Sequence, residues 1–140
     1  MNWNSRTQLL VGEEGVKKLA DSHVLVVGLG GVGAYAAEQL ARAGIGKLTI
    51  VDCDTVNETN KNRQLLALDS TLGRPKVEVM AERICDINPD VEVIALNQYL
   101  KDQSIIDLME QPFDFVVDAI DTLAPKVFLL YYAVQNKQNI

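Results

Sequence analysis

Glycines cluster between residues 28 and 33, in the part of the sequence best suited to hold a phosphate. An apolar run over 24–27 ends in Gly28, Gly30 and Gly33, and a small-residue segment then continues at helical spacing. A strand that ends in a tight turn and leads directly into a helix aims backbone N–H groups and a partial positive charge at the turn. The segment therefore predicts a nucleotide site without saying which nucleotide binds.

Two chemistries fit this loop. In the first, Asp52 follows the last glycine by about 20 residues and takes the ribose hydroxyls of NAD. In the second, the nucleotide is ATP and the site activates a carboxylate by adenylation. Adenylation needs a cation near the α-phosphate, a second cation for pyrophosphate and a carboxylate for Mg²⁺. Arg63, Lys76 and Asp121 supply these groups, but spacing alone leaves both chemistries open.

The apolar patterning predicts the elements that would position these side chains. We expect strands at 23–28, 47–51, 91–96 and 113–117, alternating with helices at 31–43, 76–87, 104–109 and from Pro125 onward. This order is typical of an α/β, Rossmann-like doubly wound fold: a mainly parallel sheet with helices on both faces. Such a sheet gathers Asp52 and Asp121 at the carboxyl ends of its strands.

The two ends of the chain carry separate expectations. Residues 1–22 are polar with scattered apolar positions, which predicts one or two short helices interrupted around Gly12 and Gly15. In the last helix, we expect Val127, Leu130, Tyr131 and Val134 to point inward. The sequence ends at Ile140, where the pattern calls for another strand, so we expect a fold truncated after its fourth βα unit.

Composition excludes several classes of protein. The chain has 140 residues, 48% of them hydrophobic and 23% charged, which is ordinary for one globular domain. Its net charge of -6 argues against a nucleic-acid grip within this segment. Without a signal pattern or a membrane-length apolar run, a cytoplasmic protein is expected. Cys53 and Cys85 have no metal-ligand spacing, and we expect both as small buried residues.

Five ordered motifs together resemble the ubiquitin-activating and MoeB/ThiF/HesA superfamily. They are Gly28-x-Gly30-Gly31-x-Gly33, Asp52-x-Asp54, Asn60-x-Asn62-Arg63-Gln64, Gly73-x-Pro75-Lys76 and Asp118-x-x-Asp121. The resemblance covers nearly the whole chain and implies one ATP-binding adenylation domain over 1–140. In this superfamily the domain adenylates a carboxylate, often the C-terminal glycine of a ubiquitin-like sulfur carrier.

The resemblance also assigns roles to individual residues. Gly31 would lie against the phosphates, Asp52 would hold the ribose, and Arg63 would bind the triphosphate. Lys76 would act at the α-phosphate, and Asp121 would organise Mg²⁺ through ATP. The nucleotide-binding set that it implies is Gly28, Gly30, Gly31, Gly33, Asp52, Asp54, Asn60, Asn62, Arg63, Gln64, Lys76 and Asp121.

Arg6 gains a role only from this resemblance. Its position alone indicates a solvated surface charge. It stands six residues before Gly12, which matches an arginine that in this superfamily reaches the active site of the partner subunit. The resemblance therefore implies a homodimer in which the 1–22 segment contacts the partner and Arg6 acts in trans with Arg63, Lys76 and Asp121.

Within the superfamily, the sequence is most similar to the tRNA threonylcarbamoyladenosine dehydratase group. The similarity lies in the glycine loop, in Ile87-Asn88-Pro89 and in Asp118-Ala119-Ile120-Asp121 followed by Pro125-Lys126. It implies adenylation of the threonylcarbamoyl carboxylate on a tRNA adenosine, followed by ring closure with net loss of water. The alternatives are a sulfur-carrier substrate, an NAD-dependent oxidoreductase, and a module that only binds nucleotide or dimerises. No catalytic cysteine is assigned.

Overall fold

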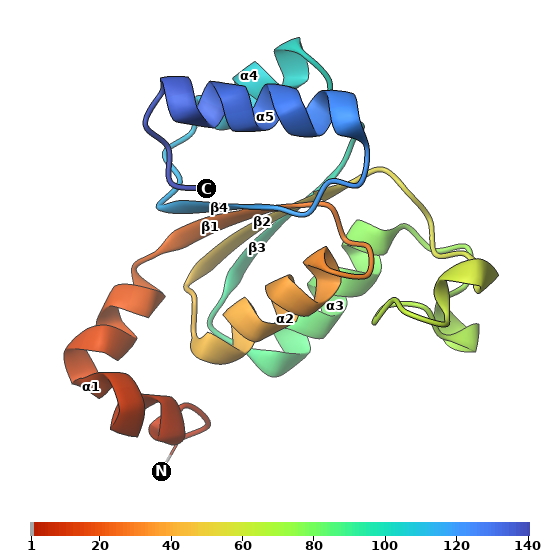
Figure 1. Ribbon diagram of the computed structural model, residues 1–140. Helices are drawn as coiled ribbons and strands as arrows, with labels where there is room; N and C mark the ends of the chain where they lie inside the picture. The colour runs from red at the N-terminus through yellow and green to blue at the C-terminus, as the bar shows by residue number, and fades with distance from the viewer. Residues whose placement is uncertain (1) are drawn as a thin grey trace.

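A four-stranded parallel sheet forms the centre of the computed structural model, which describes residues 2–140 (Figure 1). The strands are β1 (His23–Val27), β2 (Lys47–Asp52), β3 (Glu92–Asn97) and β4 (Phe115–Asp118). They lie in the order β3-β2-β1-β4, and every pairing is parallel. The strand order therefore reverses beside β1, which is where a doubly wound sheet binds its ligand.

The helices cover both faces of this sheet. Helices α2 (Gly33–Ala43) and α3 (Lys76–Ile87) lie on one face, and α4 (Gln103–Met109) and α5 (Leu123–Gln135) lie on the other (Figure 1). Short 3₁₀ turns at Glu58–Asn60 and Asp69–Thr71 interrupt the long connection between β2 and α3. The predicted Rossmann-like, doubly wound α/β fold is confirmed.

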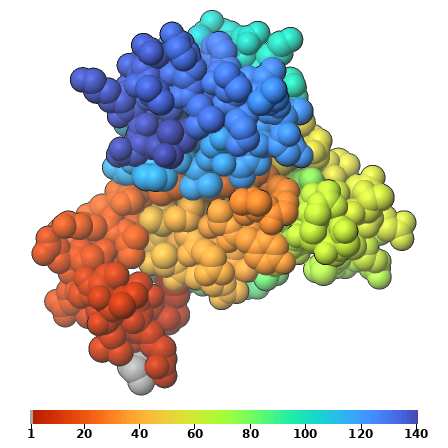
Figure 2. Space-filling view, viewed as in Figure 1, coloured from red at the N-terminus to blue at the C-terminus, as the bar shows by residue number. Residues whose placement is uncertain are grey.

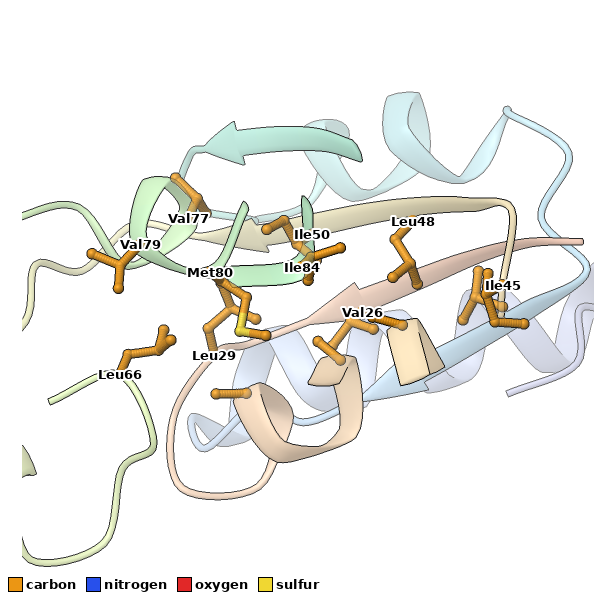
Figure 3. Packing of buried hydrophobic residues seen from close by; sticks show 14 of the residues in the cluster. Val26, Leu29, Ile45, Leu48, Ile50, Leu66, Val77, Val79, Met80 and Ile84 are labelled. Carbon is orange, nitrogen blue, oxygen red and sulfur yellow. The ribbon is translucent and has the colours of Figure 1, made fainter. Parts of the chain in front are cut away.

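Two apolar clusters fill the space between the sheet and its helices. Val24 and Val26 of β1 face the cluster under α2 and α3, whereas Leu25 and Val27 face the one under α4 and α5. This double burial explains why the strand is apolar at successive positions instead of alternating. Figure 3 shows the first cluster, where Met80 and Ile84 of α3 pack beside the strands.

Helix α5 packs on the sheet with a different face from the one predicted. The buried residues of α5 are Leu129 and Ala133, while Val127, Leu130, Tyr131 and Val134 are between 37% and 69% exposed. The prediction that these four point inward was wrong. Helix α5 is apolar on nearly every side, so its periodicity could not select the face that meets the sheet. The helix also begins at Leu123, two residues before Pro125.

Helix α1 (Ser5–Ala20) stands out from the body of the molecule and buries none of its residues (Figures 1 and 2). Gly12 interrupts it with φ 75° and ψ 173°, so the segment consists of two helical pieces joined at Gly12, as predicted. The chain remains helical through Gly15. None of the helices in the described part of the chain combines the length and the apolar character that crossing a bilayer requires.

Candidate functional site

A cavity of 740 Å³ opens at the carboxyl ends of the strands, where the doubly wound topology places a ligand. The glycine loop forms one wall, and the residues after β2, β3 and β4 form the others. Its lining includes ten of the predicted nucleotide-binding residues, which are Gly28, Gly30, Gly31, Asp52, Asp54, Asn60, Arg63, Gln64, Lys76 and Asp121. The sheet therefore brings together residues that are up to 93 positions apart in the sequence, from Gly28 to Asp121.

Three of the predicted residues do not line this cavity. Gly33 lies behind the loop, where a Cβ would come within 1.6 Å of the Gly28 carbonyl oxygen, so its role here is close packing. The Asn62 side chain accepts a hydrogen bond from the Arg63 guanidinium at 3.0 Å and meets the site only through it. Arg6 is exposed on α1, away from the cavity of its own chain.

The glycine loop is held from two sides. Gly28 has φ 97°, and a Cβ there would lie 2.4 Å from the Ala119 carbonyl oxygen, so only glycine fits without a backbone shift. On the other side, Asp52 Oδ2 accepts the Leu29 N–H at 2.7 Å while Asp52 Oδ1 accepts the Asp54 N–H at 2.7 Å. An ionised carboxylate has about four acceptor positions, so Asp52 retains capacity for ligand hydroxyls.

Lys76 is a nearly buried cation of the site. Its side chain is 5% exposed, and its ammonium lies 3.9 Å from Asp54 Oδ2, the longest of the ion pairs among residues 2–140. The backbone at Lys76 lies next to that at Asp54, because the Lys76 N–H donates a hydrogen bond to the Asp54 carbonyl at 3.0 Å. A nearly buried ammonium with so distant a partner is costly unless an anion approaches it.

Arg63 supplies a second cation on the same cavity. Its aliphatic stem lies beneath Gly31, where a Cβ would contact Arg63 Cγ at 3.6 Å. Its guanidinium is exposed and donates to the Thr59 carbonyl at 3.1 Å. The amino-terminal ends of α2, α3 and α5 also border the cavity through Val32, Lys76 and Thr122, and helix amino termini favour anions.

Carboxylates on this cavity could hold a divalent cation. Asp121 is exposed and lines the same cavity as Arg63 and Lys76, and its carboxylate offers the oxygen ligands that Mg²⁺ accepts. Asp52, Cys53 and Asp54 offer ligand atoms within 4.8 Å of one another. Both Asp52 oxygens already accept backbone hydrogen bonds, whereas the Asp121 carboxylate has no hydrogen bond or ion pair with residues 2–140, so Asp121 fits the role of magnesium ligand better.

Both cysteines are exposed free thiols, which corrects the expectation that they are buried. Cys53 lies on the cavity between two aspartates. Burial of the sulfur, followed by the charges of Asp54 and Asp52, raises the pKa of the Cys53 thiol. A raised pKa lowers the fraction of reactive thiolate at Cys53.

Sequence reasoning missed part of the lining. Gln98, Tyr99 and Leu100 follow β3 and border the cavity, and Thr122, Pro125 and Lys126 do so at the start of α5. The signal for the first group was available, because the carboxyl end of every parallel strand meets the same edge. The second group depends on the start of α5, which lies before Pro125.

Known proteins are similar to this chain over most of its length. The chain is 48% identical over 126 residues to tRNA threonylcarbamoyladenosine dehydratase of Bacillus subtilis, covering 90% of this chain and 50% of that protein. It is 42% identical over 111 residues to molybdopterin-synthase adenylyltransferase of Escherichia coli, covering 79% of this chain and 44% of that one. The chain thus spans about half the length of these relatives.

A solved structure matches almost the whole chain. It is the crystal structure of Escherichia coli tRNA N6-threonylcarbamoyladenosine dehydratase in complex with ATP, with a TM-score of 0.95 and 44% sequence identity. The match covers 96% of this chain and 56% of that one. The profile of the ThiF family matches residues 4–140. With the cavity, the glycine loop and the strand order in place, the chain belongs to the ThiF family.

Proposed function

We propose that this chain binds ATP and Mg²⁺ and adenylates a carboxylate, and that the carboxylate is the threonylcarbamoyl group of a modified tRNA adenosine. The observation that carries the proposal is Lys76, a 5% exposed ammonium on the cavity with its carboxylate partner 3.9 Å away. A bound triphosphate would place negative charge next to the Lys76 ammonium, which has no closer carboxylate among residues 2–140. The similar dehydratase that was solved with ATP supports the choice of nucleotide.

Each residue of the site has a defined task in this reaction. A carboxylate oxygen bonds to the α-phosphorus, the bond from that phosphorus to the pyrophosphate oxygen breaks, and pyrophosphate leaves. Lys76 and Arg63 stabilise the negative charge that develops on the phosphate oxygens, and the glycine loop holds the phosphates through its N–H groups. Asp52 would bind the ribose, and Asp121 would hold Mg²⁺, which would neutralise charge on the phosphates.

Adenylation makes the subsequent dehydration possible. An oxygen or nitrogen of the same modification attacks the activated carbonyl carbon, AMP leaves, and a ring closes with net loss of water. AMP carries away the carboxylate oxygen that would otherwise have to leave as hydroxide. The relatives at 40–48% identity that bear the dehydratase name support this substrate.

We further propose a homodimer in which Arg6 acts in the partner's site. Helix α1 buries no residue and stands out from the body, so Arg6 cannot serve the cavity of its own chain in this conformation. An exposed helix that carries large apolar residues, such as Leu9 and Leu10 at 85% exposure, is suited to contact a second subunit. The two free thiols fit a reducing cytoplasm.

A thermal-shift titration separates ATP from NAD. Mg-ATP at about 100 times its dissociation constant should stabilise the protein by about 2.7 kcal/mol, and NAD should leave the melting temperature unchanged. AMP formation should then depend on tRNA that bears the threonylcarbamoyl group, with the same tRNA lacking it as control. Stabilisation by NAD alone would refute the proposal.

A ubiquitin-like sulfur carrier is the second candidate acceptor. The 42% identity to molybdopterin-synthase adenylyltransferase favours it. In the same assay, AMP formation with a carrier that ends in glycine, and none with modified tRNA, would establish this acceptor and would leave the adenylation chemistry intact.

A further inference from the structure

The connection between β4 and α5 carries Asp121 and is fixed by close contacts. Its first residue, Ala119, donates its N–H to the Val27 carbonyl at 2.8 Å. The Ala119 carbonyl lies so near Gly28 that a Cβ there would approach it to 2.4 Å. The glycine loop and the 119–122 loop therefore lie against each other, so a displacement of one also shifts the other.

Asp118, the last residue of β4, braces this loop. Its side chain is 9% exposed, and both of its oxygens are used. Oδ1 accepts the Ile120 N–H at 3.0 Å, and Oδ2 accepts the Lys126 ammonium at 2.5 Å. Because a nearly buried carboxylate is costly without a counter-charge, the first bond depends on the second.

Lys126 supplies that counter-charge from the first turn of α5. Its side chain is 33% exposed and borders the cavity, but its ammonium pairs with Asp118. The contrast with Lys76 is clear, since the Lys76 ammonium lies 3.9 Å from its nearest carboxylate and the Lys126 ammonium lies 2.5 Å away. Lys126 thus connects α5 to the end of β4, across the 119–122 loop that carries Asp121.

We propose that Lys126 is a positioning residue for Asp121, acting through Asp118. The proposal rests on the proposed role of Asp121 as the magnesium ligand. Without the Lys126 cation, the Asp118 carboxylate, which already lines the cavity, has lost its counter-charge and is expected to turn away from the Ile120 N–H toward solvent. The loop then loses the bond from the Ile120 N–H to Asp118, and a competing carboxylate becomes available three residues from Asp121. Both effects alter how the site takes up Mg²⁺.

A magnesium titration tests the proposal. With saturating ATP, the rise in melting temperature is followed against Mg²⁺ concentration for the wild type, K126M and K126R. K126M should require about tenfold more Mg²⁺, and K126R, which keeps the cation, should restore most of the wild-type response. K61M is the matched control, because Lys61 pairs with Asp69 at the same 2.5 Å distance, has a 38% exposed side chain and does not line the cavity.

A second measurement does not require nucleotide. Amide hydrogen exchange over residues 119–122 should be faster in K126M and D118N than in the wild type, and combining the two changes should add little. Unchanged exchange together with an unchanged magnesium midpoint would overturn the proposal. So would weaker ATP binding at saturating Mg²⁺ with an unchanged midpoint, which would place Lys126 directly on the nucleotide. If the wild-type protein does not bind ATP but K126M still exchanges faster over residues 119–122, the proposed function is wrong. The proposal that Lys126 and Asp118 position this loop is then still supported.

Discussion

Asp52 Oδ2 lies 2.7 Å from the Leu29 backbone nitrogen and joins the end of β2 to the glycine loop. The other oxygen of the same carboxylate accepts the Asp54 N–H at 2.7 Å. One side chain thus fixes the two backbone segments that border the cavity on that side. The acidic residue that ends the second strand therefore supports the glycine loop and is also a candidate ligand for ribose.

Replacing Asp52 should destabilise the free protein as well as weaken nucleotide binding. We expect D52A to lower the free energy of unfolding by about 2 kcal/mol, because bonds to a charged acceptor contribute about 1.5–3 kcal/mol each and water replaces part of them. Urea denaturation measures this. D90A removes an exposed carboxylate from the turn before β3 and should change stability by less than about 0.5 kcal/mol. Equal effects of the two changes would contradict the bracing role.

Replacing Lys76 should separate stability from binding. K76M removes a nearly buried cation and leaves Asp54, which is 70% exposed and stays solvated. The free protein should therefore keep or gain stability, while stabilisation by Mg-ATP disappears. Lys47 pairs with Glu92 at 3.5 Å at the opposite end of the strands, so K47M should leave the ATP response intact. A K76M protein that still responds to ATP would remove Lys76 from the site.

Two glycine replacements distinguish backbone strain from close approach. Gly28 and Gly73 both have positive φ, 97° and 79°, but a Cβ at Gly73 meets nothing within 4 Å. G73A should therefore cost about 1 kcal/mol from conformation alone. G28A should cost about 1–3 kcal/mol more, because the 119–122 loop must move. Denaturant unfolding of both variants checks the difference, and identical costs would mean that the Ala119 contact yields without strain.

His23 should make stability depend on pH at the opposite end of the sheet. Burial, and then the charge of Lys47, lowers the pKa of His23 below its ordinary 6.5. The folded protein therefore binds fewer protons than the unfolded chain between the lowered pKa and 6.5. The free energy of unfolding rises with pH through that interval and falls on acidification below about 6.5.

His23 is the only histidine, so its contribution can be isolated. Its Nε2 lies 2.8 Å from Thr49 Oγ1, and H23Q keeps a polar group there without the titration. Urea denaturation between pH 5.5 and 8 should show the histidine-dependent slope in the wild type and a flatter curve in H23Q. Parallel curves would show that the His23 pKa is the same in the folded and unfolded states.

Mixed dimers test whether Arg6 acts in trans. Neither R6A nor K76M should be active alone. A randomly mixed 1:1 sample should recover about a quarter of wild-type activity, since half of the dimers are mixed and each has one complete site. Mixing R6A with the double variant R6A/K76M supplies no intact Arg6 and serves as the control. No recovery in the first mixture would leave Arg6 a surface charge.

The sequence predicted the sheet better than it predicted the helix faces. β1 and β2 were recognisable because they are buried on both sides and therefore apolar at successive positions. Gly28 and Asp52 also indicated the site, because the tight turn requires glycine at position 28 and Asp52 stands at the carboxyl end of a strand. The outward residues of α5 could not be identified, because Val127 and Tyr131 are as apolar as the buried Leu129. The Asp118–Lys126 pair was also beyond reach, since it depends on where α5 begins.

The break at Gly12 divides α1, so the direction of the part that carries Arg6 depends on the torsions of this glycine. Arg6 stands six positions before Gly12, about 9 Å of helix at 1.5 Å per residue. A change of direction of about 30° at Gly12 would swing Arg6 through about 5 Å, roughly the length of an extended side-chain stem. The torsions of one glycine therefore change the reach of the arginine.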